Sequence, residues 1–238
     1  MNEPIWRPSP QRIATSNMQK FLTRHRQKLR SEDYPGLYQW SVDDPGAFWA
    51  AAWEFFGIRS QSDYASVVDD PQRMPGARWF EGATLNFADN LLRPEYSGVA
   101  LVSYTEDGRR VELTWEALRQ QVASVAQYLR AVGVRPEDRV AGLLPNCPEA
   151  IVAMLATASI GAIWSSCSPD FGINGVLDRF GQIEPKILFA TDGYFYNGKN
   201  IDSRPSVETI AGKLHELRAL IIVAYRGDES DLRAFPDA

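Results

Sequence analysis

The chain has 238 residues, of which 45% are hydrophobic and 23% are charged, as in a folded globular protein with one large core or two small ones. Its formal net charge of -5 excludes the broad basic field that attracts a nucleic-acid backbone or an anionic membrane. It shows no apolar run of membrane-spanning length and no signal peptide. Because Cys147 and Cys167 match no zinc or disulfide spacing, we expect a cytoplasmic protein.

Residues 1–97 are rich in aromatic side chains and are expected to form a helical N-terminal cap. Apolar spacing predicts a helix over residues 16–29, with inward positions at Met18, Phe21, Leu22 and Leu29. A second helix is expected to follow Asp44, which can cap it, and to end at Gly57. Its predicted buried positions are Phe48, Trp49, Ala52, Trp53 and Phe56. We interpret these rings as packing against a larger body, and an aromatic ligand cage is the alternative.

Residues 98–238 are expected to begin a second domain with a β-hairpin and a helix. The apolar runs 99–104 and 109–114 flank Asp107-Gly108, a pair that favours a tight turn. Thr114 is positioned to cap a helix that runs to Leu129, before Gly133 stops the pattern. Its predicted inward positions are Leu118, Val122, Val125, Ala126 and Leu129.

Beyond the hairpin, apolar strands alternate with amphipathic helices. The expected strands are 140–144, 162–166, 186–190 and 220–225, and the expected helices are 148–159, 173–183 and 207–217. This alternation predicts an α/β fold, a doubly wound parallel sheet flanked by helices. The residues from 226 onward are polar, although a further strand or helix of such a sheet would be expected there. We therefore expect a partial sheet. Its exposed edge and apolar face favour self-association.

Two loops at the carboxyl ends of these strands are candidate ligand sites. Residues 165–172 place the hydroxyl of Ser168 and the carboxylate of Asp170 before a helix N-terminus, which attracts anions. The alternative is that these two side chains only cap that helix. Residues 191–200 combine three aromatic rings with Lys199, which suits a nucleotide-like ligand with a phosphate. The alternative is a turn whose rings pack on a neighbouring domain.

We expect no catalytic or metal-binding residue in this chain. His25 and His215 occur on polar helix faces and are expected to be solvated, and no Walker, G-x-S-x-G or H-E-x-x-H motif is present. Cys147 precedes a predicted helix, where the pKa of a thiol can be lowered. A nucleophilic role is the minor alternative, because no general base accompanies it.

Three segments are similar to a known family: RWFEGATLNFADNLL, DRVAGLLPNCPEAIVAMLATASIGAIWSSCSPDFG and VLDRFGQIEPKILFATDGYFYNGK. They resemble the N-terminal portion of the acetoacetyl-CoA synthetases, which are adenylate-forming ligases related to the acetyl- and propionyl-CoA synthetases. The resemblance covers about residues 6–225, and WSVDDPGAFWAAAWEFFGI resembles the cap of the short-chain members. It implies that acetoacetate attacks the α-phosphate of Mg²⁺-bound ATP, and that the CoA thiol then displaces AMP from the acyl-adenylate.

The resemblance also implies which binding and catalytic residues lie in which part of the longer family chain. The ATP-phosphate loop, the acidic ribose motif and the catalytic lysine lie further along, so this stretch alone is expected to be inactive and to bind at most CoA. The residues that the resemblance assigns to CoA are Tyr196, Asn197, Gly198, Lys199, Ser168, Pro169 and Asp170. Lys199 is expected to face a phosphate. The acetyl-specific relatives look to have arginines in place of Tyr196 and Lys199, and glycines in the 168–170 loop.

Two other functions fit the same sequence. One is a ligase for another short acid, such as propionate, because the family's acid-pocket residues lie mostly downstream. The other is a non-catalytic module that binds CoA or assembles through its surfaces. For the ligase, the resemblance implies a place in lipid or ketone-body metabolism.

Overall fold

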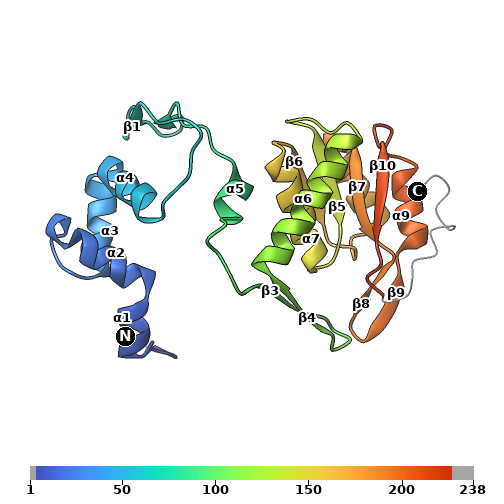
Figure 1. The fold of residues 1–238 in the computed structure, drawn as a ribbon, viewed down its shortest axis with the longest axis horizontal. Coiled ribbons are helices and arrows are strands. Elements are labelled where there is room, and N and C mark those ends of the chain that lie inside the picture. The colour runs from blue at the N-terminus through green and yellow to red at the C-terminus, as the bar shows by residue number, and fades with distance from the viewer. Residues whose placement is uncertain (1–3, 227–238) are drawn as a thin grey trace. The chain divides into compact units, whose positions relative to one another are not determined.

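The computed structural model describes residues 4–226, whose course is drawn in Figure 1. The chain divides into two compact units, the first ending at Leu85 and the second beginning at Asn86. The short helix α5 (Phe87–Leu91) packs in the second unit against α7 (Pro148–Ser159), and the Asn86 side-chain amide donates a hydrogen bond of 2.7 Å to the Ala158 carbonyl. A domain boundary after residue 97 stays a prediction.

The first unit is mainly helical. Its elements are α1 (Pro10–Thr15), α2 (Asn17–His25), the 3-10 helix η1 (Arg26–Lys28), α3 (Tyr34–Asp43), α4 (Pro45–Phe55), and the antiparallel strands β1 (Ser66–Val68) and β2 (Trp79–Glu81). The predicted cap of α4 is confirmed, since the Asp44 carboxylate accepts the N–H of Ala47 at 3.0 Å. Gly57 ends the segment with a φ of 58°, a conformation that glycine adopts without strain.

Aromatic rings pack on one another inside this unit. Its buried core consists of Phe21, Leu22, Leu37, Trp40, Ala51 and Ala52. The prediction that Met18, Trp49 and Phe56 face inward is wrong, because their exposed fractions are 48%, 49% and 55%. α4 carries apolar residues on all sides, so spacing alone did not identify its buried face.

The two histidines have different environments. His215 is exposed, in a turn rather than on a helix. The expectation of a solvated His25 is wrong, because its ring lies 4.7 Å from Phe21 and 5.5 Å from Trp40 between ring centroids. Burial is the main cause that lowers the pKa of His25, followed by the charge of Lys28. His25 is therefore part of the aromatic packing of the first unit.

The second unit begins with the predicted hairpin and helix. β3 (Val99–Tyr104) and β4 (Arg110–Thr114) pair antiparallel, and Gly108 in their turn has a φ of 85°. α6 (Trp115–Ala131) follows, and its N-terminus is capped by the Thr114 hydroxyl, which accepts the N–H of Ala117 at 3.2 Å. Of the five predicted inward residues, Leu118, Val122, Ala126 and Leu129 are buried and Val125 is partly buried. Both elements are therefore as the sequence predicts.

A four-stranded parallel sheet forms the centre of this unit, which confirms the predicted α/β fold. Its strands are β5 (Arg139–Leu143), β6 (Ile163–Cys167), β7 (Ile187–Thr191) and β10 (Ala219–Val223), in the order β10-β7-β5-β6. Side chains of β7 alternate between the two faces of the sheet and so divide the core, since Ile187 packs with α6 and α7 on one face and Leu188 packs on the other. That other face is covered by α8 (Ile173–Ile183) and α9 (Arg204–Ala211). β6 and β7 flank β5 on opposite sides, so the strand order reverses between β5 and β7.

Two boundaries differ from the sequence prediction. α9 occupies Arg204–Ala211 rather than 207–217, because Pro205 suits a helix start and the chain turns after Gly212. Residues 191–200 are not a loop, since β8 (Gly193–Tyr196) and β9 (Lys199–Asp202) form an antiparallel hairpin. Asn197 and Gly198 join them with φ values of 51° and 71°, both positive as in a type I′ turn.

Candidate functional site

The β8–β9 hairpin presents two faces of different composition. The cross-strand pairs Tyr194 with Ile201 and Tyr196 with Lys199 share one face, because side chains alternate along each strand. Phe195 and its partner Asn200 lie on the opposite face. The exposed Tyr196 and Lys199, both expected to contact CoA, are therefore neighbours on one face.

Asn197 and Gly198 form the exposed tip between these two strands. These two residues can offer backbone groups to a ligand but do not form a shaped pocket, because the type I′ turn projects beyond the paired strands. The four residues expected from 196 to 199 thus lie together at one end of the hairpin. Their arrangement offers a ring, a cation and turn amides to a ligand that approaches from the Tyr196 side.

The second expected contact, residues 168–170, lies between β6 and α8. α8 has Gly172 as its N-cap, with no side-chain hydrogen bond at that cap. The alternative that Ser168 and Asp170 only cap this helix is therefore wrong. Pro169 lies between them, and the Ser168 carbonyl accepts the N–H of Phe171 at 3.2 Å, which folds the segment back on itself.

Electrostatics link this loop to the hairpin. Burial is the largest cause that raises the pKa of Tyr194, and the negative charge of Asp170 is the next. Asp170 thus acts on the hairpin face that carries Tyr196 and Lys199. The two expected segments follow β6 and β7, on the carboxyl-end side of the parallel sheet, where an open sheet of this kind binds ligands.

The turn of the β3–β4 hairpin reaches the same region, a contact that the sequence did not predict. The Gly198 N–H donates a long hydrogen bond of 3.5 Å to the Glu106 carboxylate. The guanidinium carbon of Arg109 lies 5.8 Å from the centroid of the Phe195 ring. Because these residues are about ninety positions from the hairpin in sequence, no local pattern could have shown the contact.

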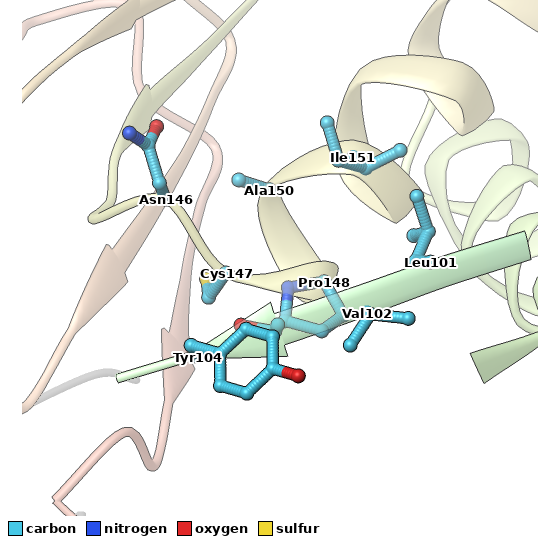
Figure 2. Close-up of a pocket in the computed structure, with 9 residues that line it drawn as sticks. Leu101, Val102, Tyr104, Asn146, Cys147, Pro148, Ala150 and Ile151 are labelled. Atoms are coloured by element: carbon cyan, nitrogen blue, oxygen red, sulfur yellow. The ribbon is translucent and has the colours of Figure 1, made fainter. Parts of the chain in front are cut away.

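Cys147 lies at the start of α7, beside a cavity of about 470 Å³ between β3 and α7. Figure 2 shows Cys147 and Pro148 next to Val102 and Tyr104. Burial raises the pKa of the Cys147 thiol to about 12, which opposes any lowering by the helix N-terminus. The alternative of a nucleophilic Cys147 is therefore wrong. The wall of this cavity is formed by apolar and uncharged side chains, which suits packing better than acid-base chemistry.

Two kinds of feature were not found in the part of the chain that the structure describes. Residues 4–226 contain no group of three histidine, cysteine, aspartate or glutamate side chains that could hold a metal ion. The helices within the same residues are all too short or too polar to cross a membrane.

Known protein families match nearly the whole second unit and much of the first. A family model described as AMP-binding enzyme matches residues 93–237, and one described as acetyl-coenzyme A synthetase N-terminus matches residues 34–91. The chain therefore belongs to the AMP-binding enzyme family.

Individual relatives include acetoacetyl-CoA synthetases and a malonamoyl-CoA synthetase. The chain is 46% identical to an acetoacetyl-coenzyme A synthetase of Rhizobium meliloti (strain 1021), over 96% of its own length and 35% of the relative. It is 39% identical to a malonamoyl-CoA synthetase of Penicillium aethiopicum, over 98% of its length and 34% of the relative. The solved acetoacetyl-CoA synthetase from Streptomyces lividans has a TM-score of 0.86 and 46% identity, with 96% of this chain and 36% of that chain covered. The chain thus spans about a third of the length of the relatives it matches.

Proposed function

We propose that the chain is the N-terminal part of an ATP-dependent ligase that joins acetoacetate to CoA. In this reaction acetoacetate and ATP form an acyl-adenylate and pyrophosphate, and the CoA thiolate then displaces AMP. The observation that carries the proposal is the 46% identity to acetoacetyl-CoA synthetases across 96% of this chain. We place the ligase in the cytoplasm and in lipid or ketone-body metabolism.

Within the ligase, we assign the nucleotide end of CoA to the β8–β9 hairpin and the 168–170 loop. Lys199 offers an ammonium to a CoA phosphate, and the exposed ring of Tyr196 offers a stacking surface for the adenine. Asn197 and Gly198 supply turn amides as hydrogen-bond donors. Burial raises the pKa of Tyr194 most, and the charge of Asp170 raises it further, which supports including Ser168, Pro169 and Asp170 in the assignment.

The ATP phosphates and Mg²⁺ are assigned to parts of the ligase outside the described residues. In the family that the chain resembles, the phosphate loop and the catalytic lysine lie further along, and residues 4–226 contain no group of three histidine, cysteine, aspartate or glutamate side chains that could hold a metal ion. When bound, MgATP activates the carboxylate, and this chain contributes to the later thioester step. The isolated chain is therefore expected to give no acetoacetate-dependent exchange between ATP and pyrophosphate.

A second candidate is a ligase for a different short acid. The malonamoyl-CoA relative supports it, since its identity of 39% is close to the 40% shared with an acetoacetyl-CoA synthetase of Danio rerio. Malonamate has an amide where acetoacetate has a methyl ketone, so the two acids have nearly the same shape. Propionate, in contrast, lacks the carbonyl at the third carbon.

The CoA assignment can be tested by calorimetric titration of the chain with CoA and with dephospho-CoA. Lys199→Ala is expected to weaken CoA binding about tenfold, the size of one charge-assisted hydrogen bond to phosphate. A matched control is Lys213→Ala, because Lys213 is also an exposed lysine but lies beyond α9. A smaller effect on dephospho-CoA would identify the 3′-phosphate as the partner of Lys199. Equal CoA affinity in Lys199→Ala and the parent chain would refute the assignment.

A further inference from the structure

Arg109 lies where the β3–β4 turn, the β8–β9 hairpin and the end of β10 meet. Its Nε donates to the Asp107 carboxylate at 2.6 Å, and one terminal nitrogen donates to the Tyr225 carbonyl at 2.7 Å. Its guanidinium carbon lies 5.8 Å from the Phe195 ring centroid and 5.2 Å from that of Tyr225. The two rings themselves are 6.2 Å apart, so Arg109 connects three elements through one planar group.

Arg109 contacts the hairpin from the side opposite to the proposed CoA contacts. It approaches Phe195, whereas Tyr196 and Lys199 lie on the other face of the same two strands. The Arg109 side chain would have to pass through the hairpin to contact a ligand on the Tyr196 face directly. Its effect on that face can therefore only come from how it holds the strands.

The hairpin depends on such support because its strands have only four residues each. An isolated two-stranded hairpin is marginally stable in water, and one face must pack on something to be fixed. At the base, Gly193 leaves no room for a side chain, since a Cβ there would lie within 2.3 Å of the Ile201 carbonyl. Near the tip, the contacts to the rest of the unit include Glu106 to Gly198, Arg109 to Phe195, and the ring pair of Phe195 and Tyr225 that Arg109 also contacts.

We infer that Arg109 is a positioning residue for CoA binding, because it fixes the β8–β9 hairpin against β10 and so holds Tyr196 and Lys199 in place. The inference rests on the proposed function for the site where CoA binds. A hairpin that is released from Arg109 must be ordered again by each CoA molecule that binds, which weakens binding without removing any ligand contact. Formation of the acyl-adenylate does not involve CoA and is unaffected.

The experiment compares Arg109→Ala with Arg110→Ala in the intact ligase. Arg110 is a matched control at the next position, the first residue of β4, since it stacks on Tyr104 and pairs with Glu112 rather than with the β8–β9 hairpin. Arg109→Ala is expected to raise the KM for CoA about tenfold, while acetoacetate-dependent ATP–pyrophosphate exchange keeps its parent rate. Arg109→Lys keeps the charge but loses the planar fork, so its KM should lie between those of Arg109→Ala and the parent.

Amide hydrogen exchange of residues 193–202 provides the second readout and needs no ligand. Arg109→Ala should accelerate exchange there, whereas Arg110→Ala should not. Unchanged exchange, or a parent KM for CoA in Arg109→Ala, overturns the inference. A parent KM in Lys199→Ala together with a raised KM in Arg109→Ala would remove Lys199 from the CoA site and leave the positioning role standing. Loss of ATP–pyrophosphate exchange in Arg109→Ala would show a general structural role and also overturn it.

Discussion

At the scale of single residues, burial decides the chemistry of the groups near the sheet's carboxyl edge. Cys147 is only 4% exposed, and the pKa of its thiol is raised to about 12. The pKa of Cys167 is also raised, chiefly by burial. Both thiols therefore behave as small apolar side chains, although the sequence places one of them at a helix start.

This predicts slow reaction of both cysteines with an aromatic disulfide reagent at pH 8. A thiol with a pKa of about 12 is ionised at that pH in only about one molecule in ten thousand. The native chain should react far more slowly than the chain in denaturant, which serves as the control. Reaction of Cys147 at the rate of the unfolded chain would contradict the buried, protonated thiol.

The same shift makes stability depend on alkaline pH. The folded pKa of Cys147 lies above the model-compound value of 9.0, so its proton stabilises the fold fully below pH 9. That contribution is lost as the pH rises toward about 12. Cys147→Ala should therefore flatten the fall of the unfolding free energy above pH 9, as measured by urea denaturation at several pH values. An equally steep fall in the variant would assign the alkaline loss to other groups.

At the scale of elements, one buried carboxylate fastens the end of β10. Asp192 is 5% exposed, and its side chain accepts the N–H groups of Tyr225 at 2.8 Å and Arg226 at 3.3 Å. These bonds join the start of β8 to the chain that leaves β10. No sequence pattern distinguishes Asp192 from the other residues of the 191–200 segment, because its partners are more than thirty positions away.

Asp192→Ala is expected to lower the free energy of unfolding by about 1–3 kcal/mol, since the N–H groups of Tyr225 and Arg226 lose a partly buried carboxylate acceptor. Asp192→Asn keeps an acceptor oxygen in nearly the same position and should lose less. Urea denaturation of the two variants and the parent measures the difference. Equal loss in Ala and Asn would mean that the charge, rather than the hydrogen bonds, matters at this position.

Elements with a clear spacing of apolar residues and with capping or turn residues at their ends were predictable from the sequence, whereas elements without them were not. The strands β5, β6, β7 and β10 are apolar runs bounded by turns. Thr114 and Asp44 are N-cap residues that indicate where their helices begin. The β8–β9 hairpin was missed, although Asn197-Gly198 is a strong turn signal, because its strands are short and partly polar. The location of the candidate site followed from the strand ends. The contact between Arg109 and the β8–β9 hairpin could not be predicted, because contacts between turns that are distant in sequence leave no local pattern.

At the scale of the whole molecule, an apolar groove lies beside an edge strand of the sheet. Among the described residues 4–226, β10 is the outermost strand of the sheet on its side, and a groove of about 490 Å³ runs beside it over α6 and α7. Its apolar lining is provided by Val125, Val152, Ala153, Phe189, Ile221 and Val223. An open strand edge next to an apolar groove favours association of copies.

We therefore expect the chain to self-associate as its concentration rises, with Ile221→Glu shifting it toward the monomer. Val102→Glu is the control, because Val102 is an exposed apolar residue that lies on β3, away from this groove. Sedimentation velocity at several concentrations distinguishes the species. A parent chain that remains monomeric throughout would show that the groove does not mediate association.

The proposed identity of the whole protein is tested most directly by its choice of acid. The intact ligase that contains this chain would be given ATP, Mg²⁺ and CoA with acetoacetate, malonamate or propionate, and the formation of AMP and thioester would be followed. The account predicts the highest kcat/KM with acetoacetate, and one AMP released for each acetoacetyl-CoA formed. A higher kcat/KM with malonamate or propionate, or thioester formation without AMP, would contradict it.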